Sequence, residues 1–157
     1  MHMKGQKERR FRVVMKHDMK YRFVSQAGED DRLHGEPYLS DEPDPVGDAA
    51  GPSTPSLLGS AIGHCLSASL LESLRKAHVD VAGFETEVVS VVQRNSEGFP
   101  RIERVEVILR PEIDHTSSAT TRSEAEFEKH CTVCSSVKKG IDIRVSVDWR
   151  VADEKVV

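Results

Sequence analysis

Residues 54–76 read TPSLLGSAIGHCLSASLLESLRK, and this stretch decides the fold. Thr54 is placed to cap a helix N-terminus, and Pro55 suits the first helical position, where no amide hydrogen is needed. Apolar residues recur every fourth position, at Leu58, Ile62, Leu66, Leu70 and Leu74. A second row lies beside them, at Leu57, Ala61, Cys65 and Ala68. An apolar face this broad predicts a core helix that more than one layer covers. The helix is expected to end near Arg75, Lys76 and His78, whose positive charges suit a helix C-terminus.

Upstream of this helix, apolar and polar residues first alternate, and the chain then becomes mainly polar. Apolar residues alternate with others on both sides of a turn expected at His17-Asp18, namely Phe11, Val13 and Met15 before it and Tyr21 and Phe23 after it. This period of two predicts a β-hairpin. Residues 28–53 are rich in Gly, Pro and Asp, which predicts a long ordered loop with fixed turns.

Downstream, two strands are expected at residues 84–93 and 102–110, joined by a hairpin loop at 95–98 and ended by Pro111. The spacing of Thr121 and Glu124 is typical of a capping box, so a second helix is expected to run from there to about Lys139. A last strand alternates at Ile141, Ile143, Val145, Val147 and Trp149. The predicted order is ββ-α-ββ-α-β, an α+β fold in one domain over residues 1–157.

Composition describes an ordinary surface and an aliphatic core. Of the 157 residues 31% are charged and 5% are aromatic, and the net charge is −4. A mildly acidic balance argues against a nucleic-acid partner. We expect neither a membrane span nor a signal peptide, and therefore a cytoplasmic protein. In that reducing compartment the three cysteines are expected to be structural, catalytic or metal-binding.

The cysteines carry the candidate chemistry. Cys65 lies on the apolar side of the core helix, and on its own it is better explained as a small buried hydrophobe than as a nucleophile. Cys131 and Cys134 form a C-x-x-C within the second helical segment, a spacing that favours redox activity or metal binding. If both helices pack on the same sheet, Cys65 and Cys131 are able to meet, although periodicity does not establish that contact.

Two stretches carry a resemblance to a known family. The first contains Asp41-Glu42-Pro43, Gly47 and Gly51-Pro52-Ser53-Thr54-Pro55, and leads into the helix that carries Cys65. The second, residues 130–141, reads HCTVCSSVKKGI and runs through a glycine into the last strand. In this order, and over residues 10–150, they resemble the OsmC/Ohr (osmotically inducible / organic hydroperoxide resistance) family.

The resemblance implies an intertwined homodimer in which each sheet borrows strands from the partner and the active sites lie at the interface. In peroxide-reducing members the first cysteine attacks the peroxide and becomes a sulfenic acid. The second cysteine then forms a disulfide with it, which a dithiol or lipoyl-type reductant reopens. Carried over, Cys65 is the attacking thiol and Cys131 the resolving thiol, and no cofactor is required.

The chain departs from the family at two points. Those members activate the thiol with an arginine held by a glutamate at the start of the central helix, where this chain has Pro55 and Ser56. Arg22 and Arg32 are the available substitutes, with Glu42 as a possible partner for either. Cys134 occupies a position where the family tends to have serine. A plain substitution of serine by cysteine, with no role, explains Cys134 as well as the two functional alternatives together. In those alternatives Cys134 is a partner of Cys131 or a zinc ligand.

The sequence therefore predicts a thiol-dependent peroxide reductase that uses Cys65 and Cys131 on an organic hydroperoxide or hydrogen peroxide. The alternative is a non-catalytic dimer that binds zinc or a small apolar ligand. In that case Cys65, Cys131 and Cys134 would join either His64 or His130 as ligands.

Overall fold

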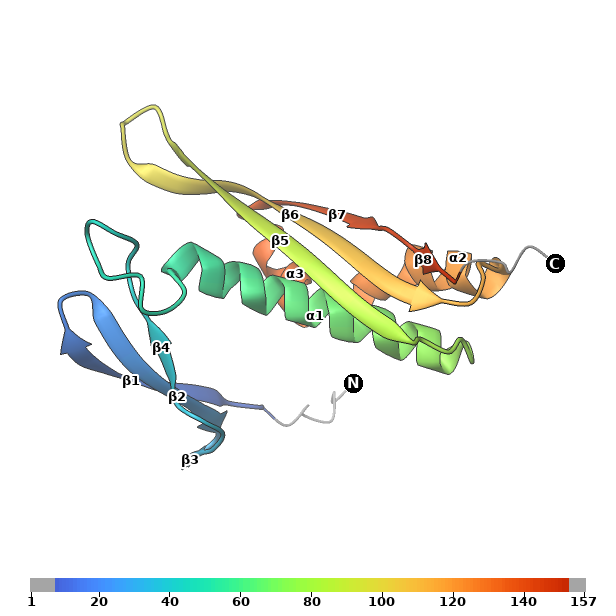
Figure 1. Ribbon diagram of the computed structural model, residues 1–157, viewed down its shortest axis with the longest axis horizontal. Coiled ribbons are helices and arrows are strands. Elements are labelled where there is room, and N and C mark those ends of the chain that lie inside the picture. Colours follow the sequence, from blue (N-terminus) through green and yellow to red (C-terminus); the bar gives the residue numbers. More distant parts are fainter. Residues whose placement is uncertain (1–7, 153–157) are drawn as a thin grey trace, which may run out of the picture. The chain divides into compact units, whose positions relative to one another are not determined.

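A small antiparallel sheet forms at the start of the chain (Figure 1). The structure is a computed structural model that describes residues 8–152, and its contacts divide the chain after Thr54 into a first and a second unit. The strands of the first unit are β1 (Phe11–Met19), β2 (Arg22–Glu29), β3 (Arg32–Leu33) and β4 (Tyr38–Ser40), and β2 pairs with each of the others. The turn between β1 and β2 lies at Lys20-Tyr21, so the position expected at His17-Asp18 is wrong. Lys20 takes the left-handed conformation, with φ 46°, that suits a tight hairpin turn.

The polar stretch after β2 is organised around one carboxylate. Asp41 is 4% exposed and accepts hydrogen bonds from the backbone N–H groups of Glu42 (2.8 Å), Asp48 (3.1 Å) and Ala50 (3.2 Å). Burial opposes ionisation of this carboxyl group, but the three backbone donors and the charge of Arg22 lower its pKa overall. The segment expected to be a loop also contains β3 and β4, each of three residues or fewer.

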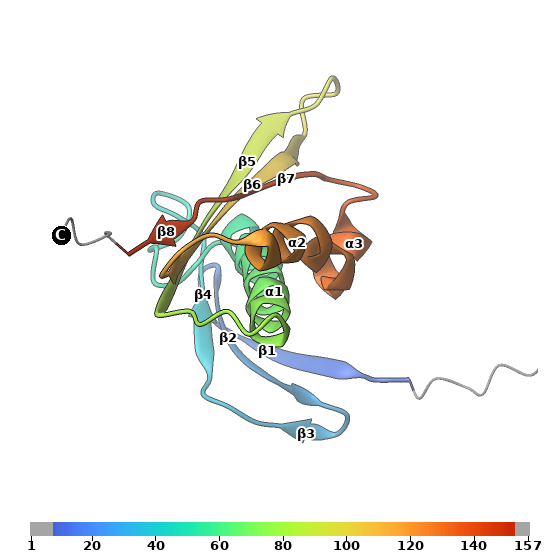
Figure 2. The ribbon, with the colours of Figure 1, turned by 90° about the vertical axis from the view of Figure 1, so that its right-hand side faces the viewer.

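The second unit is a mixed sheet with helices on one side (Figure 2). Its elements are α1 (Thr54–Lys76), β5 (Gly83–Arg94), β6 (Pro100–Ile113), α2 (Ser118–Glu126), the 3-10 helix η1 (Phe127–His130), α3 (Thr132–Val137), β7 (Asp142–Val147) and β8 (Arg150–Val151). Strand β6 pairs antiparallel with β5, and parallel with β7 and β8. The α+β class is confirmed, with more elements than the predicted order contains.

Helix α1 packs closely on β5. The predicted apolar row is confirmed, since Ile62, Leu66, Leu70 and Leu74 are each 0% exposed. Burying each of these side chains contributes about 1.5–3 kcal/mol. Gly59 and Gly63 are buried as well, because the sheet lies so near that a Cβ atom added to Gly63 would be 2.6 Å from Val88 Cγ2. Across the same contact, the hydroxyls of Ser67 and Thr86 lie 2.6 Å apart.

Among residues 8–152, α1 is the one helix whose length and hydropathy would allow it to cross a membrane. Such a helix was not predicted from the sequence. The apolar row of α1 is instead covered by protein, in a core that includes Val105, Val107 and Leu109 of β6.

Strand β6 continues through Pro111 to Ile113, so the strand end expected at Pro111 is wrong. The carbonyls of Leu109 and Ile113 accept hydrogen bonds from Asp148 and Ala152, on the side where β7 stops and β8 begins. Pro111 alternates with these two residues, so its missing N–H faces the interruption between β7 and β8. A proline is tolerated there because no ladder bond is lost.

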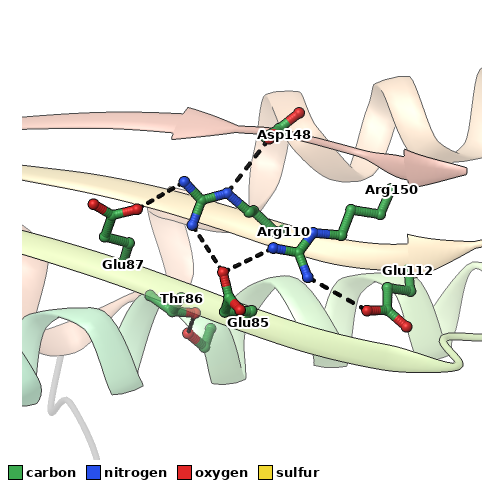
Figure 3. A network of polar contacts seen from close by, with 8 residues as sticks. Glu85, Thr86, Glu87, Arg110, Glu112, Asp148 and Arg150 are labelled. Atoms are coloured by element: carbon green, nitrogen blue, oxygen red, sulfur yellow. Dashed lines mark hydrogen bonds and ion pairs between the residues drawn. The ribbon is translucent and has the colours of Figure 1, made fainter.

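The opposite face of the sheet is charged (Figure 3). Arg110 on β6 contacts three carboxylates, those of Glu87 at 2.7 Å, Glu85 at 3.0 Å and Asp148 at 3.4 Å. Arg150 also contacts Glu85, at 2.8 Å. Polar partners on this face and apolar residues on the other explain why the sequence of β6 alternates.

The second helical segment differs from the prediction. It begins at Ser118 with Ser117 as the cap and Thr120 completing the capping box, not with Thr121 and Glu124. Its single predicted helix is divided into α2, η1 and α3, and the division before α3 falls at Cys131.

Candidate active site

The predicted attacking thiol lies at the wall of a cavity. Cys65 is one position before the buried row residue Leu66, and it is half-buried, whereas Cys131 and Cys134 are buried. The cavity has a volume of about 580 Å³ and lies entirely within the second unit. It is lined by Ala61, His64, Cys65, Ala68, Ser69, Glu72, Ser73, Lys76, His130 and Val133. This volume lies in the range of small-molecule sites.

The predicted resolving thiol lies where the backbone changes direction. Cys131 has an extended conformation (φ −80°, ψ 101°) between η1 and α3, and is the N-cap of α3. Its Sγ accepts a hydrogen bond of 3.3 Å from the backbone N–H of Cys134, as a serine or aspartate oxygen does at other helix starts. The side chain of Phe127, 1% exposed, fixes the preceding turn in the core.

The structure brings Cys65 and Cys131 together. The side chain of Cys65 packs against the core that contains Cys131 and Cys134, and it is near enough to influence the pKa of Cys131, although 66 positions separate the two residues in the sequence. All three cysteines are free thiols. The proximity of Cys65 and Cys131, which the sequence pattern permitted without establishing, is therefore present within the second unit.

Burial raises the pKa of the Cys131 thiol to about 12, and the hydrogen bond with Cys65 acts in the same direction. The amide of Cys134 opposes this shift, because it stabilises the thiolate. Burial also raises the pKa of Cys134, and the nearby charge of Lys138 partly offsets it. At neutral pH both buried cysteines are therefore protonated. Since the thiolate is the reactive form, neither is expected to react first with an external oxidant.

Of the predicted supporting residues, Arg22, Arg32 and Glu42 belong to the first unit, and Cys134 belongs to the second. Arg22 is ion-paired with Asp18 (Nε–Oδ2, 2.7 Å), and Arg32 is exposed on β3. Within residues 8–152 Glu42 forms no ion pair, and its backbone N–H is bound by Asp41. A role for these residues in activating Cys65 remains a prediction.

The sequence reading missed most of the polar groups that line the cavity. Lys76 contacts Glu72 (Nζ–Oε1, 3.3 Å), and hydrogen bonding from Arg75 lowers the pKa of Glu72 to about 2, so this carboxylate is ionised. Ser69, Glu72 and Lys76 follow Cys65 by four, seven and eleven positions. This helical spacing places them on the same face, and it is the signal that could have identified them.

A metal centre was the alternative use of the cysteines. Among the residues that the structure describes, no three His, Cys, Asp or Glu side chains are grouped in a way that could hold a metal ion. The zinc reading therefore rests on the sequence alone.

Comparison with known proteins identifies the fold. The structure is similar to that of an OsmC-like protein from Mycoplasma pneumoniae (14% identity, TM-score 0.70, covering 94% of this chain and 100% of that one). It is also similar to the organic hydroperoxide resistance protein OhrB of Bacillus subtilis (14%, TM-score 0.60, 88% and 97%). A third similar structure is an organic hydroperoxide resistance protein OsmC from Legionella pneumophila (10%, TM-score 0.59, 92% and 99%).

No curated protein sequence matches the chain. The family model for OsmC-like proteins matches residues 47–146, from the glycine after the Asp41 turn to the penultimate residue of β7, and it includes all three cysteines. The chain therefore belongs to the OsmC-like protein family.

Proposed function

We propose that this protein is a thiol-dependent peroxide reductase in which Cys65 attacks the peroxide and Cys131 resolves the product. The observation that carries the proposal is the proximity of these two side chains, which come from distant parts of the sequence and pack in one core beside the cavity. Membership of a family that includes organic hydroperoxide resistance proteins supports it.

The difference in burial supports the division of roles. Cys65 reaches the cavity, so its sulfur is available to a small oxidant. Cys131 is 0% exposed and protonated at neutral pH, so it is protected until Cys65 has been oxidised. Cys65, the accessible thiol, is therefore the nucleophile, and the buried Cys131 reacts only after Cys65 has been oxidised.

The Cys65 thiolate attacks one peroxide oxygen and the O–O bond breaks, which gives a sulfenic acid on Cys65 and an alkoxide that is protonated to the alcohol. The Cys131 sulfur then attacks the Cys65 sulfur, a disulfide forms and water leaves. A dithiol reductant opens the disulfide by exchange and is itself oxidised.

The cavity favours an organic hydroperoxide over hydrogen peroxide. Its volume of about 580 Å³ greatly exceeds what hydrogen peroxide needs, and Ala61, Ala68 and Val133 give it apolar wall. An alkyl or aryl group bound there would hold the peroxide beside Cys65 and contribute binding energy that hydrogen peroxide lacks.

We also propose that the protein acts as a cytoplasmic homodimer. On β1, alternate apolar side chains remain exposed in the single chain, with Phe11 68%, Val13 50% and Met15 52% exposed. A contiguous apolar row of this kind is typical of a surface that a partner covers. A reducing cytoplasm would supply the dithiol or lipoyl-type reductant that the cycle requires.

The test is consumption of cumene hydroperoxide by the purified protein with dihydrolipoamide as reductant. We expect Cys65→Ser to abolish turnover. Cys131→Ser should leave a sulfenic acid on Cys65 that dimedone traps. Ser135→Ala, an exposed change on α3 beside the cysteines, is the matched control and should retain turnover. Undiminished peroxide consumption by Cys65→Ser would refute the proposal. Stoichiometric zinc in a preparation without turnover would instead favour the binding alternative.

A further inference from the structure

Cys134 is a third thiol in contact with the proposed redox pair. It is 1% exposed, its backbone N–H donates to Cys131 Sγ at 3.3 Å, and interaction with the Cys131 side chain lowers the pKa of its own thiol, which burial raises. Cys131 therefore lies between two sulfur partners, Cys65 from α1 and Cys134 from α3. The proposed peroxidase cycle uses only one of these partners.

The local backbone favours a second disulfide. Cys131 is the N-cap of α3 and Cys134 is three residues later, the two positions whose side chains and amides meet in a capping box. Extended backbone at Cys131 followed by helical turn directs its sulfur to the amide of Cys134, as the bond of 3.3 Å shows. The two cysteines are thus already adjacent in the reduced protein.

We propose that Cys134 takes over the disulfide from Cys65, so that the three cysteines act as a relay. This inference rests on the proposed function, because the Cys65–Cys131 disulfide must form first. The Cys134 sulfur attacks Cys131 Sγ, the Cys131–Cys134 bond forms and the Cys65–Cys131 bond breaks. The electron pair of the broken bond returns to Cys65 as a thiolate, and the proton of Cys134 is released to it or to solvent.

Two opposite charges lie near Cys134. Burial has the largest effect on the pKa of Cys134 and raises it, the charge of Lys138 lowers it, and the charge of Glu128, the ion-pair partner of Lys138, raises it. A nearby cation stabilises the Cys134 thiolate that begins the exchange. Its result is that the thiol facing the cavity is regenerated before the reductant arrives, while the disulfide is stored within α3.

Trypsin distinguishes the two disulfides directly. Cleavage after Lys129 and Lys138 releases a peptide, His130–Lys138, that contains both Cys131 and Cys134, whereas Cys65 is in the peptide Leu33–Arg75. The reduced protein is treated with one equivalent of cumene hydroperoxide, quenched with acid, alkylated and digested. A relayed disulfide leaves His130–Lys138 lighter by two hydrogens and unalkylated, with Cys65 alkylated. An unrelayed disulfide links the two peptides.

For the wild type we expect the disulfide within His130–Lys138. Cys134→Ser and Cys134→Ala should each accumulate the linked peptides, about tenfold or more above the wild-type level, and a thermal melt of both variants checks that they fold. Linked peptides alone in the wild type would overturn the relay and leave the peroxidase proposal intact. Formation of the Cys131–Cys134 disulfide at an undiminished rate in Cys65→Ser would also overturn it. Absence of any disulfide together with absence of peroxide consumption would defeat both proposals.

Discussion

Replacing Gly63 by alanine tests how closely α1 packs on the sheet that positions the thiols. The added Cβ would lie 2.6 Å from Val88 Cγ2 on β5 and 3.5 Å from Thr86 Cγ2. Ordinary van der Waals contact begins at 3.4 Å, so α1 or β5 must yield by about 0.8 Å. Val88 is on the strand next to β6, which limits how far it can retreat.

Two effects set the expected magnitude. Overpacking a close contact of this kind costs about 1–3 kcal/mol. The higher helix propensity of alanine returns about 1 kcal/mol in the interior of α1. We therefore expect Gly63→Ala to lower the free energy of unfolding by about 0–2 kcal/mol. The double variant Gly63→Ala/Val88→Ala should recover at least about 1 kcal/mol relative to additivity, because the clashing methyl is removed.

Urea unfolding monitored by tryptophan fluorescence measures these differences. Trp149 is the only tryptophan, and its indole N–H donates to Glu124 at 2.9 Å in the second unit, so its emission reports on that unit. Gly140→Ala is the matched control, because a Cβ at this exposed glycine would meet only the Val137 carbonyl, at 4.0 Å. A double variant without coupling between the two positions would refute the close approach.

Three further outcomes follow from the burial of single groups. Phe127→Ala should destabilise the protein by about 3–5 kcal/mol in the same urea assay, because its ring is 1% exposed. Since the pKa of Cys131 is raised from 9.0 to about 12, the unfolded chain ionises first, and stability should fall as pH rises from about 9 to about 12. Cys131→Ala should flatten that alkaline slope. The pKa of Asp41 is lowered from 3.8, so its stabilising effect is present above that pH and lost on further acidification, and Asp41→Asn should weaken the acid dependence measured by circular dichroism.

Periodicity predicted the elements that are uniform over many residues. Helix α1 and the inward face of β7 were predicted because one side of each element repeats without interruption, as the 0% exposure of Leu66 and Leu70 shows. Two irregular features were not predicted, namely the continuation of β6 through Pro111 and the break of the second helical segment at Cys131. Each depends on a neighbour elsewhere in the chain. Pro111 fits within β6 only because β7 has stopped beside it, and that end depends on how residues 147–150 turn.

The candidate site divides in the same way. The identities of Cys65 and Cys131 came from the resemblance of the motifs, but their contact depends on the packing of α1 against a helical segment that breaks at Cys131. No local signal indicates that break, since HCTVC contains neither glycine nor proline. His130 lines the cavity for the same reason, because the turn at η1 places it there.

The burial that protects Cys131 creates a kinetic requirement for the proposed cycle. With a pKa of about 12, roughly one molecule in 10⁵ carries the Cys131 thiolate at pH 7. Attack by that small fraction alone would make resolution slow. However, the side chain of Cys65 lies beside Cys131, and the reaction expels hydroxide from the Cys65 sulfur. Transfer of the Cys131 proton to that departing oxygen, as the disulfide bond forms, releases water and generates the nucleophile in one event, so resolution does not require the free Cys131 thiolate.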